Sequence, residues 1–218
     1  MEDRVVIVLG SVATGKTTLI NLATQRGDIG VSHGIKPGTT KVECIRSKRP
    51  LEGRNVIFID TPGFDALDDP DEKVVETIMD FLSTNNLKVD TILYLYSLAS
   101  NRMTNKSFDR LQLLTNIWQG DIAQHLVIVT TMWNEINPNT GEAREKEFRS
   151  RIESEAITNG CTFERFDCTT DSVSRILRHS FQRVTNMPLY VNEIAGSRKP
   201  KRKPTSLLQR ILASLCMS

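Results

Sequence analysis

Short apolar runs alternate along this chain with stretches in which apolar residues recur at helical spacing. The apolar runs predict strands at residues 5–9, 55–60, 91–96, 125–130 and 161–166, and residues 40–46 alternate well enough for a sheet-edge strand. Helical spacing predicts helices over residues 18–23, 74–82, 108–118, 142–157 and 173–184. This alternation predicts an α/β domain whose sheet is mostly parallel.

The pattern changes after Gly196, where no core element is predicted. Residues 198–204 are all basic or proline, and leucine and isoleucine then recur at helical spacing over 207–215. We therefore expect a domain at 1–195 and, at 196–218, a basic linker with a short amphipathic helix. Such a tail can lie on an anionic membrane surface, dock on a partner protein, serve as a nuclear-localisation patch or stay solvated.

Composition narrows the class of protein. Of 218 residues, 39% are hydrophobic and 25% are charged, which is typical of a soluble globular chain. The net charge of +2 gives no reason to expect a nucleic-acid partner. Cys44, Cys161, Cys168 and Cys216 lack metal-ligand spacing, so free thiols are expected. The first strand follows the N-terminus directly and no apolar stretch is long enough to span a bilayer, so the expected location is cytoplasmic.

The most informative motif follows the first predicted strand. Gly10-Ser11-Val12-Ala13-Thr14-Gly15-Lys16-Thr17 fits the phosphate-binding loop pattern G-x-x-x-x-G-K-[ST] and, with Thr18, opens the first helix. Glycines let the backbone turn its N–H groups toward an anion, and the helix N-terminus adds partial positive charge. Lys16 is expected to reach the β- and γ-phosphates, and the Thr17 hydroxyl to bind Mg²⁺.

A second motif, Asp60-Thr61-Pro62-Gly63, ends the strand at 55–60. In a P-loop protein this D-x-x-G pattern indicates a switch: Asp60 holds Mg²⁺, usually through water, and the Gly63 N–H senses the γ-phosphate. Thr39 or Thr40 can supply the switch I threonine that binds Mg²⁺, and we favour Thr40. The predicted metal ligands are thus Thr17, Thr40 and Asp60, and the predicted catalytic groups are Lys16, Thr40 and Gly63.

Together these motifs resemble a known family of P-loop proteins. With N-R-M-T at 101–104 and T-T-M-W at 130–133, they resemble the G domains of the septin and immunity-associated (GIMAP-type) branch of the TRAFAC GTPases, and a fungal group of G-domain proteins in particular. The resemblance covers about residues 4–185. It implies a Ras-like fold with a six-stranded, mostly parallel sheet and helices on both faces, and a nucleotide at the carboxyl ends of the strands.

The resemblance also implies the ligands and the partner. GTP, GDP and Mg²⁺ are the expected ligands, and the expected partner is a second copy or a related G domain across the nucleotide face. A partner can supply a residue in trans, and Arg102 and His33 are candidates, although a solvated loop role fits each equally well.

The base-reading motif departs from that of a strong GTPase. The segment that should read N-K-x-D is Thr131-Met132-Trp133-Asn134-Glu135. Met132 can cover the base and Trp133 can stack on it, unless Trp133 is a packing aromatic. Asn134 stands where an aspartate should be, and an amide cannot accept two hydrogen bonds from guanine as a carboxylate does. Either Glu135 reads the base or the base selectivity is weak.

The hydrolytic residue also differs. Phe64 follows Gly63 where Ras-like enzymes have a glutamine that positions water, and Val12 and Ala13 add bulk to the P-loop. Slow turnover is therefore expected. We favour a slow, dimerisation-controlled GTPase switch. The alternatives are a nucleotide-dependent assembly module that hardly hydrolyses, an NTPase that accepts ATP as well as GTP, and a small-molecule kinase, which the D-T-P-G motif disfavours.

Overall fold

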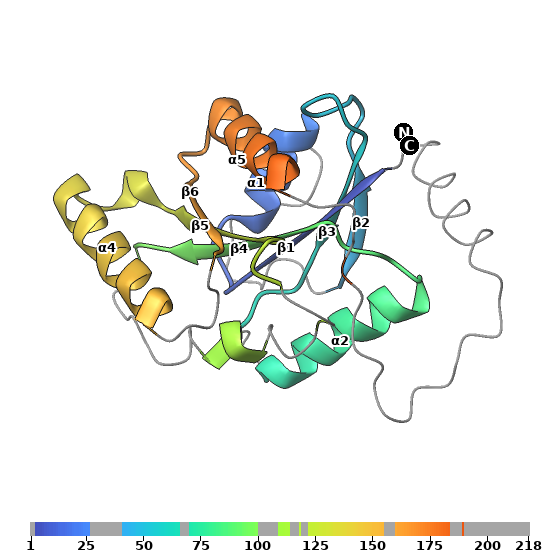
Figure 1. The fold of residues 1–218 in the computed structure, drawn as a ribbon, viewed down its shortest axis with the longest axis horizontal. Coiled ribbons are helices and arrows are strands. Elements are labelled where there is room, and N and C mark those ends of the chain that lie inside the picture. The colour runs from blue at the N-terminus through green and yellow to red at the C-terminus, as the bar shows by residue number, and fades with distance from the viewer. Residues whose placement is uncertain are drawn as a thin grey trace.

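A computed structural model describes residues 3–26, 41–65, 70–99, 109–113, 118, 122–154, 160–183 and 189. The described residues form one six-stranded sheet in the order β2-β3-β1-β4-β5-β6 (Figure 1). The strands are β1 (Arg4–Gly10), β2 (Glu43–Arg46), β3 (Val56–Asp60), β4 (Thr91–Ser97), β5 (Leu126–Thr131) and β6 (Thr162–Arg165). All six lie where the sequence predicts a strand.

The sheet is parallel except at one edge. β2 pairs antiparallel with β3, whereas the pairs β1–β3, β1–β4, β4–β5 and β5–β6 are parallel. The predicted edge strand within residues 40–46 is therefore confirmed as β2. Because the other five strands run the same way, the ends of β1, β3, β4 and β5 meet at one rim of the sheet, where ligands bind in such folds.

Helices cover both faces of the sheet (Figure 1). They are α1 (Lys16–Thr24), α2 (Asp71–Thr84), α4 (Pro138–Ser154) and α5 (Thr170–Arg183). β1 shows how the two faces arise, because successive side chains point to opposite sides. Val6 and Val8 pack in the core cluster that contains α1 and α5. Ile7 and Leu9 pack in the cluster that contains α2 and α4.

The helix boundaries differ from the predicted ones in physically understandable ways. α1 begins at Lys16, inside the P-loop motif. α4 begins at Pro138 and not at residue 142, because proline suits the first turn of a helix, where its missing N–H is not needed. Phe148 and Ile152 of its predicted apolar stripe are buried. For the helix predicted over 108–118, residues 109–113 are helical.

Several predictions lie outside the described residues. These include His33, Thr39, Thr40, Arg102 and the whole tail at 196–218, so the domain boundary stays a prediction. Cys44, Cys161 and Cys168 are free thiols, as expected. Among the helices of the described ranges, none is both long and apolar enough to cross a membrane.

Candidate nucleotide-binding site

The P-loop forms a tight turn between the end of β1 and the start of α1. Gly10 has φ +146°, and a Cβ there would lie 2.5 Å from the Leu95 carbonyl oxygen of β4. Gly15 precedes α1 with φ +90°, which also favours glycine. Ala13 accepts the same left-handed region with φ 60°. The two motif glycines are therefore required by backbone shape, as the sequence predicts.

Lys16 is buried at the centre of this turn, with 7% of its surface exposed. Its Nζ donates hydrogen bonds to the Gly10 carbonyl oxygen at 3.0 Å and to the Ser11 carbonyl oxygen at 2.8 Å. Burial lowers the pKa of Lys16 to about 8, and the nearby Asp60 carboxylate opposes that shift. A buried ammonium group of this kind is stabilised by an added anion, which is the property a phosphate site needs.

Two of the three predicted magnesium ligands, Thr17 and Asp60, meet beside Lys16, whereas Thr40 lies outside the described residues. The Thr17 hydroxyl donates to Asp60 Oδ2 at 2.9 Å, across the gap between α1 and the end of β3. Thr61 fixes the strand end, because its hydroxyl donates to the Val8 carbonyl oxygen at 2.7 Å. A hydroxyl and a carboxylate are hard oxygen ligands of the kind Mg²⁺ prefers. The pair supplies two of the oxygen ligands that such a cation needs. Within the described residues, no group of three or more His, Cys, Asp or Glu could hold a metal ion.

Gly63 and Phe64 close against the P-loop. The Val12 N–H donates to the Phe64 carbonyl oxygen at 2.8 Å, and the Phe64 N–H donates to the Gly10 carbonyl oxygen at 3.2 Å. A Cβ on Gly63 would lie 2.7 Å from the Val12 N and Cα atoms, so this close approach requires glycine. The Phe64 side chain is fully buried in the core. Phe64 thus anchors the segment and does not face the phosphate site.

The segment predicted to bind the base, residues 131–135, follows β5, and we call it the base loop. Of its side chains, Met132 approaches the P-loop. Met132 has φ 62°, and its Cε lies 3.7 Å from the position of a Cβ on Gly15. Phe166, which the sequence did not single out, approaches the same point to 3.9 Å. Asn134 and Glu135 are exposed in the short helix η1 (Trp133–Glu135). Met132 and Phe166 therefore form an apolar wall next to Gly15.

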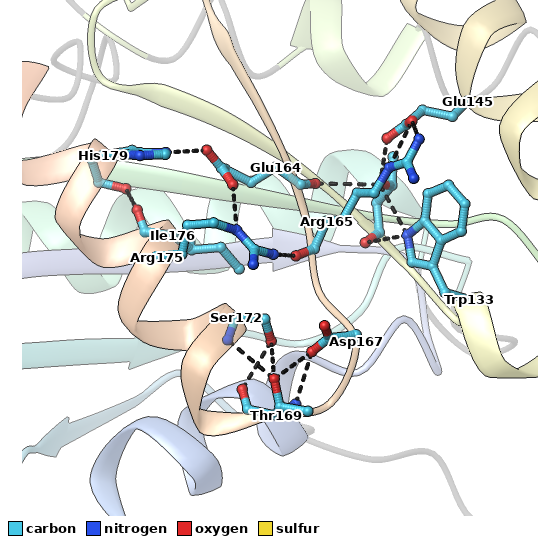
Figure 2. Close-up of polar contacts among 12 residues, drawn as sticks. Trp133, Glu145, Glu164, Arg165, Asp167, Thr169, Ser172, Arg175, Ile176 and His179 are labelled. Carbon is cyan, nitrogen blue, oxygen red and sulfur yellow. Dashed lines mark hydrogen bonds and ion pairs between the residues drawn. The ribbon is translucent and has the colours of Figure 1, made fainter.

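The Trp133 side chain lies beside Arg165 (Figure 2). Its Nε1 donates to the carbonyl and hydroxyl oxygens of Thr130, each at 3.2 Å. The Arg165 guanidinium stacks over the indole, 4.1 Å from the ring centroid. A Cβ on Gly141 of α4 would lie 3.0 Å from the indole. This geometry supports the alternative that Trp133 is a packing aromatic that shapes the loop.

A network of polar side chains lies next to Trp133 and includes Glu145 and Arg165 (Figure 2). Buried Glu145 of α4 accepts a hydrogen bond from the Thr130 hydroxyl at 3.0 Å and another from Arg165 Nε at 2.9 Å. A cavity of about 570 Å³ lies alongside, lined by Trp133, Arg149, Phe163, Glu164, Arg165, Asp167 and Arg175. Its three arginines are matched by acidic neighbours: Arg175 bonds Glu164, and both Arg165 and Arg149 pair with Glu145. Neither sign of charge dominates this cavity.

The loop after β6 lies close to the base loop. Burial raises the pKa of Cys168, and the negative charges of Asp167 and Glu135 raise it further. Cys168 and Glu135 are therefore near enough to interact electrostatically. The Thr169 hydroxyl bonds Asp167, which lowers the pKa of Asp167 and holds its carboxylate at the start of α5.

A P-loop whose lysine and threonine meet the aspartate of the neighbouring strand, on a sheet of this order, defines a Ras-like P-loop G domain. The predicted fold class is thus confirmed. The chain belongs to the family described as 50S ribosome-binding GTPase, whose model matches residues 5–132, more than half of the chain. The prediction of a TRAFAC-type GTPase is confirmed at the level of this family.

Known proteins that are similar to this chain are consistent with the family assignment. Translocase of chloroplast 90 from Arabidopsis thaliana is 29% identical over 130 residues, which are 58% of this chain and 16% of that protein. The chain thus spans about a sixth of the length of this relative. Toc33 from Arabidopsis thaliana, solved with Mg²⁺ and GMPPNP, has a TM-score of 0.68 at 18% identity, covering 88% of this chain and 89% of Toc33.

A further structure belongs to work on the chloroplast translocon components atToc33 and psToc159, for which dimerisation is important for GTPase activity. Its TM-score is 0.67 at 16% identity, covering 89% of this chain and 87% of the other. At this level of identity both structural matches show that the fold is shared.

Proposed function

We propose that this chain binds GTP and GDP with Mg²⁺ and is a switch that hydrolyses GTP slowly, under the control of dimerisation across the nucleotide face. The observation that carries the proposal is the contact between Thr17 and Asp60 beside buried Lys16. It supports a phosphate-bound cation at the sheet rim. Membership of a GTPase family and the Mg²⁺ and GMPPNP bound to Toc33 support the same ligands.

Each predicted residue has a role in this proposal. The backbone from Gly10 to Thr18 surrounds the phosphates, Lys16 pairs with their charge, and Gly63 contacts the γ-phosphate. Thr17, Asp60 and Thr40 hold Mg²⁺, which when bound neutralises charge on the β- and γ-phosphate oxygens. Thr131, Met132, Asn134 and Glu135 form the base site, in which we assign the apolar cover to Met132 and the carboxylate to Glu135. Trp133 positions this loop.

Dimerisation enters the proposal because the residue that directly follows Gly63 is Phe64, whose side chain cannot position water by hydrogen bonding. Phe64 is fully buried, so a group from another element or another molecule must complete the site. The importance of dimerisation for the GTPase activity of atToc33 and psToc159 supports a second copy or a related G domain as that molecule. Arg102 and His33 are the candidates on this chain.

The same burial of Phe64 favours a second candidate function. If no partner supplies the missing group, the chain is a nucleotide-dependent assembly module that hardly hydrolyses GTP. The two functions share one binding site and differ in whether GDP is formed. Product analysis with and without conditions that promote dimerisation separates them.

The finer placement of the chain rests on sequence alone. The N-R-M-T and T-T-M-W boxes support a position in the septin and GIMAP-like branch, close to fungal G-domain proteins. The basic run at 198–204 and the apolar spacing after it support contact of the tail with a membrane surface or a partner protein, in a cytoplasmic setting. The domain at 1–195 carries the nucleotide site in this scheme.

Titration calorimetry against GTP, GDP, ATP and XTP with Mg²⁺ tests the proposal. We expect GTP and GDP to bind more tightly than ATP and XTP, with GDP formed slowly from GTP. An Asn134→Asp variant should increase the preference for GTP over XTP by about tenfold, about 1.4 kcal/mol, because a carboxylate accepts from both guanine N–H groups. Equal binding of GTP, ATP and XTP by the native chain would remove the guanine assignment. No binding of any of them would remove the whole proposal.

The pKa of Lys16 predicts how nucleotide affinity depends on pH. Lys16 loses its proton near pH 8 in the free protein, whereas bound phosphates should hold the proton on. Affinity is therefore level below about pH 8 and falls above it, by about tenfold at pH 9, because binding must then take up a proton. Calorimetry in two buffers of different ionisation enthalpy should show that the number of protons taken up per bound nucleotide rises toward one as the pH increases above 8. Constant affinity from about pH 7.5 to 9 would contradict this role of Lys16.

A further inference from the structure

A buried arginine joins the P-loop to the segment after Gly63. Arg110 lies in the helical stretch 109–113 that follows β4 in the chain, and 3% of its side chain is exposed. Its Nη1 donates to the Ser11 hydroxyl of the P-loop at 3.1 Å. Its Nε donates to Asp71 Oδ2 at 2.7 Å, and its Nη2 contacts Asp65. One side chain thus contacts two parts of the chain that are far apart in the sequence, the P-loop and the stretch from Asp65 to Asp71.

The two carboxylates are themselves connected. The Asp65 N–H donates to Asp71 Oδ1 at 3.0 Å, so Arg110, Asp65 and Asp71 form a closed ring of hydrogen bonds. Asp71 is the first residue of α2, and Asp65 has a left-handed φ of 66°. The ring therefore fixes both ends of the segment that leads from Gly63 to α2.

Phe64 connects this ring of hydrogen bonds to the P-loop. The Arg110 Cζ lies 6.0 Å from the centroid of the Phe64 ring, and the Phe64 backbone bonds both Gly10 and Val12. Gly63, the predicted γ-phosphate contact, packs directly against Val12. A displacement of Gly63 therefore moves Phe64 and Asp65 relative to Ser11, and Arg110 must follow one side or lose a bond.

We propose that Arg110 is a positioning residue that couples binding of the γ-phosphate at Gly63 to the helical stretch 109–113. That stretch directly continues residues 101–108, which contain Arg102, the candidate for the dimer face. The inference rests on the proposed function. A planar guanidinium serves three partners at once, whereas a lysine ammonium cannot reproduce this fork. Arg110 thus makes the helical stretch 109–113 respond to the presence of the γ-phosphate.

The test compares GDP and GMPPNP on the full chain with Mg²⁺. Dissociation constants come from calorimetry, and the dimer fraction with each nucleotide comes from sedimentation. In Arg110→Lys we expect GDP affinity to stay within about twofold, while the preference for GMPPNP over GDP shrinks by about fivefold or more. Nucleotide-dependent dimer formation should shrink in parallel, because coupling between two sites is reciprocal.

Two further variants complete the design. Arg178→Lys changes an exposed arginine that bonds Glu52 on the surface, and it should leave both readouts unchanged. Ser11→Ala removes one partner of Arg110, so we expect a smaller loss, and the double variant should add little to Arg110→Lys. If Arg110→Lys does not fold, Ser11→Ala tests the coupling through the same ratio of GMPPNP affinity to GDP affinity.

The outcomes separate the inference from the function beneath it. A native chain that binds neither nucleotide overturns the proposed function. A native chain that binds both, with Arg110→Lys or Ser11→Ala unchanged in preference and dimer fraction, overturns the coupling alone. The coupling also fails if the native chain binds GDP and GMPPNP equally, or if Arg110→Lys weakens both to the same extent.

Discussion

Lys16→Ala should abolish nucleotide binding while the fold stays intact. The ammonium group is the positive charge that the P-loop holds at its centre, bonded to the Gly10 and Ser11 carbonyl oxygens. Charge-assisted contacts to phosphate are among the strongest polar interactions available, so their loss should lower affinity by at least about a hundredfold. Calorimetry with GDP and Mg²⁺ measures this directly, because GDP avoids turnover.

The stability of the same variant has an expected sign. A lysine with a folded-state pKa near 8 and an unfolded-state value near 10.5 favours the unfolded state wherever the group is charged. This cost is fully present below about pH 8 and disappears as the pH rises toward 10.5. Lys16→Ala should therefore unfold at no lower urea concentration than the native chain at pH 7. Lys146→Ala, on the exposed side of α4, is the matched control and should bind normally. GDP binding by Lys16→Ala would contradict the P-loop assignment.

Phe64→Gln should destabilise the protein and should not speed GTP hydrolysis. Phe64 stands where a Ras-like enzyme has its water-positioning glutamine. From the sequence alone, the substitution would therefore be expected to restore that glutamine and to speed hydrolysis. The structure predicts otherwise, because the side chain is fully buried among apolar residues of the core. Removing a buried aromatic ring and burying an amide should cost about 3–5 kcal/mol, a large part of a typical folding free energy.

Urea unfolding and single-turnover hydrolysis, measured at a temperature where the variant is folded, check this expectation. Phe64→Leu keeps apolar volume and should cost less than about 1.5 kcal/mol. Phe163→Gln, at the half-buried edge strand β6, controls for the chemistry of the exchange and should cost much less than Phe64→Gln. A stable Phe64→Gln with faster hydrolysis would show that this side chain can reach the nucleotide.

The P-loop and D-x-x-G motifs could be recognised in the sequence because each depends on residues that are close together along the chain. The P-loop needs glycine where φ is positive, and Gly10 and Gly15 both meet that need. The D-x-x-G motif ends a strand next to β1, and the apolar runs are long enough for their order to predict a parallel sheet. The contact between Thr17 and Asp60 follows from these placements, since neighbouring parallel strands bring their ends together.

Side-chain direction was not readable in the same way. The sequence offered Trp133 either as a base-stacking ring or as a packing aromatic. The structure favours the packing role, because the indole beyond the left-handed turn at Met132 lies against Arg165 and Gly141. Phe166 was missed for the same reason, since a single phenylalanine after a strand carries no signal of the loop it will face.

The sequence by itself thus determined the class of protein and the order of its elements, and it predicted the residues of the phosphate site. These follow from periodicity and from motifs whose members are close along the chain. Only the tertiary structure decided the burial of Phe64, the packing of Trp133 against Arg165 and the contacts of Arg110 with Ser11, Asp65 and Asp71. These contacts join residues far apart in the chain, and packing of the whole domain sets their geometry.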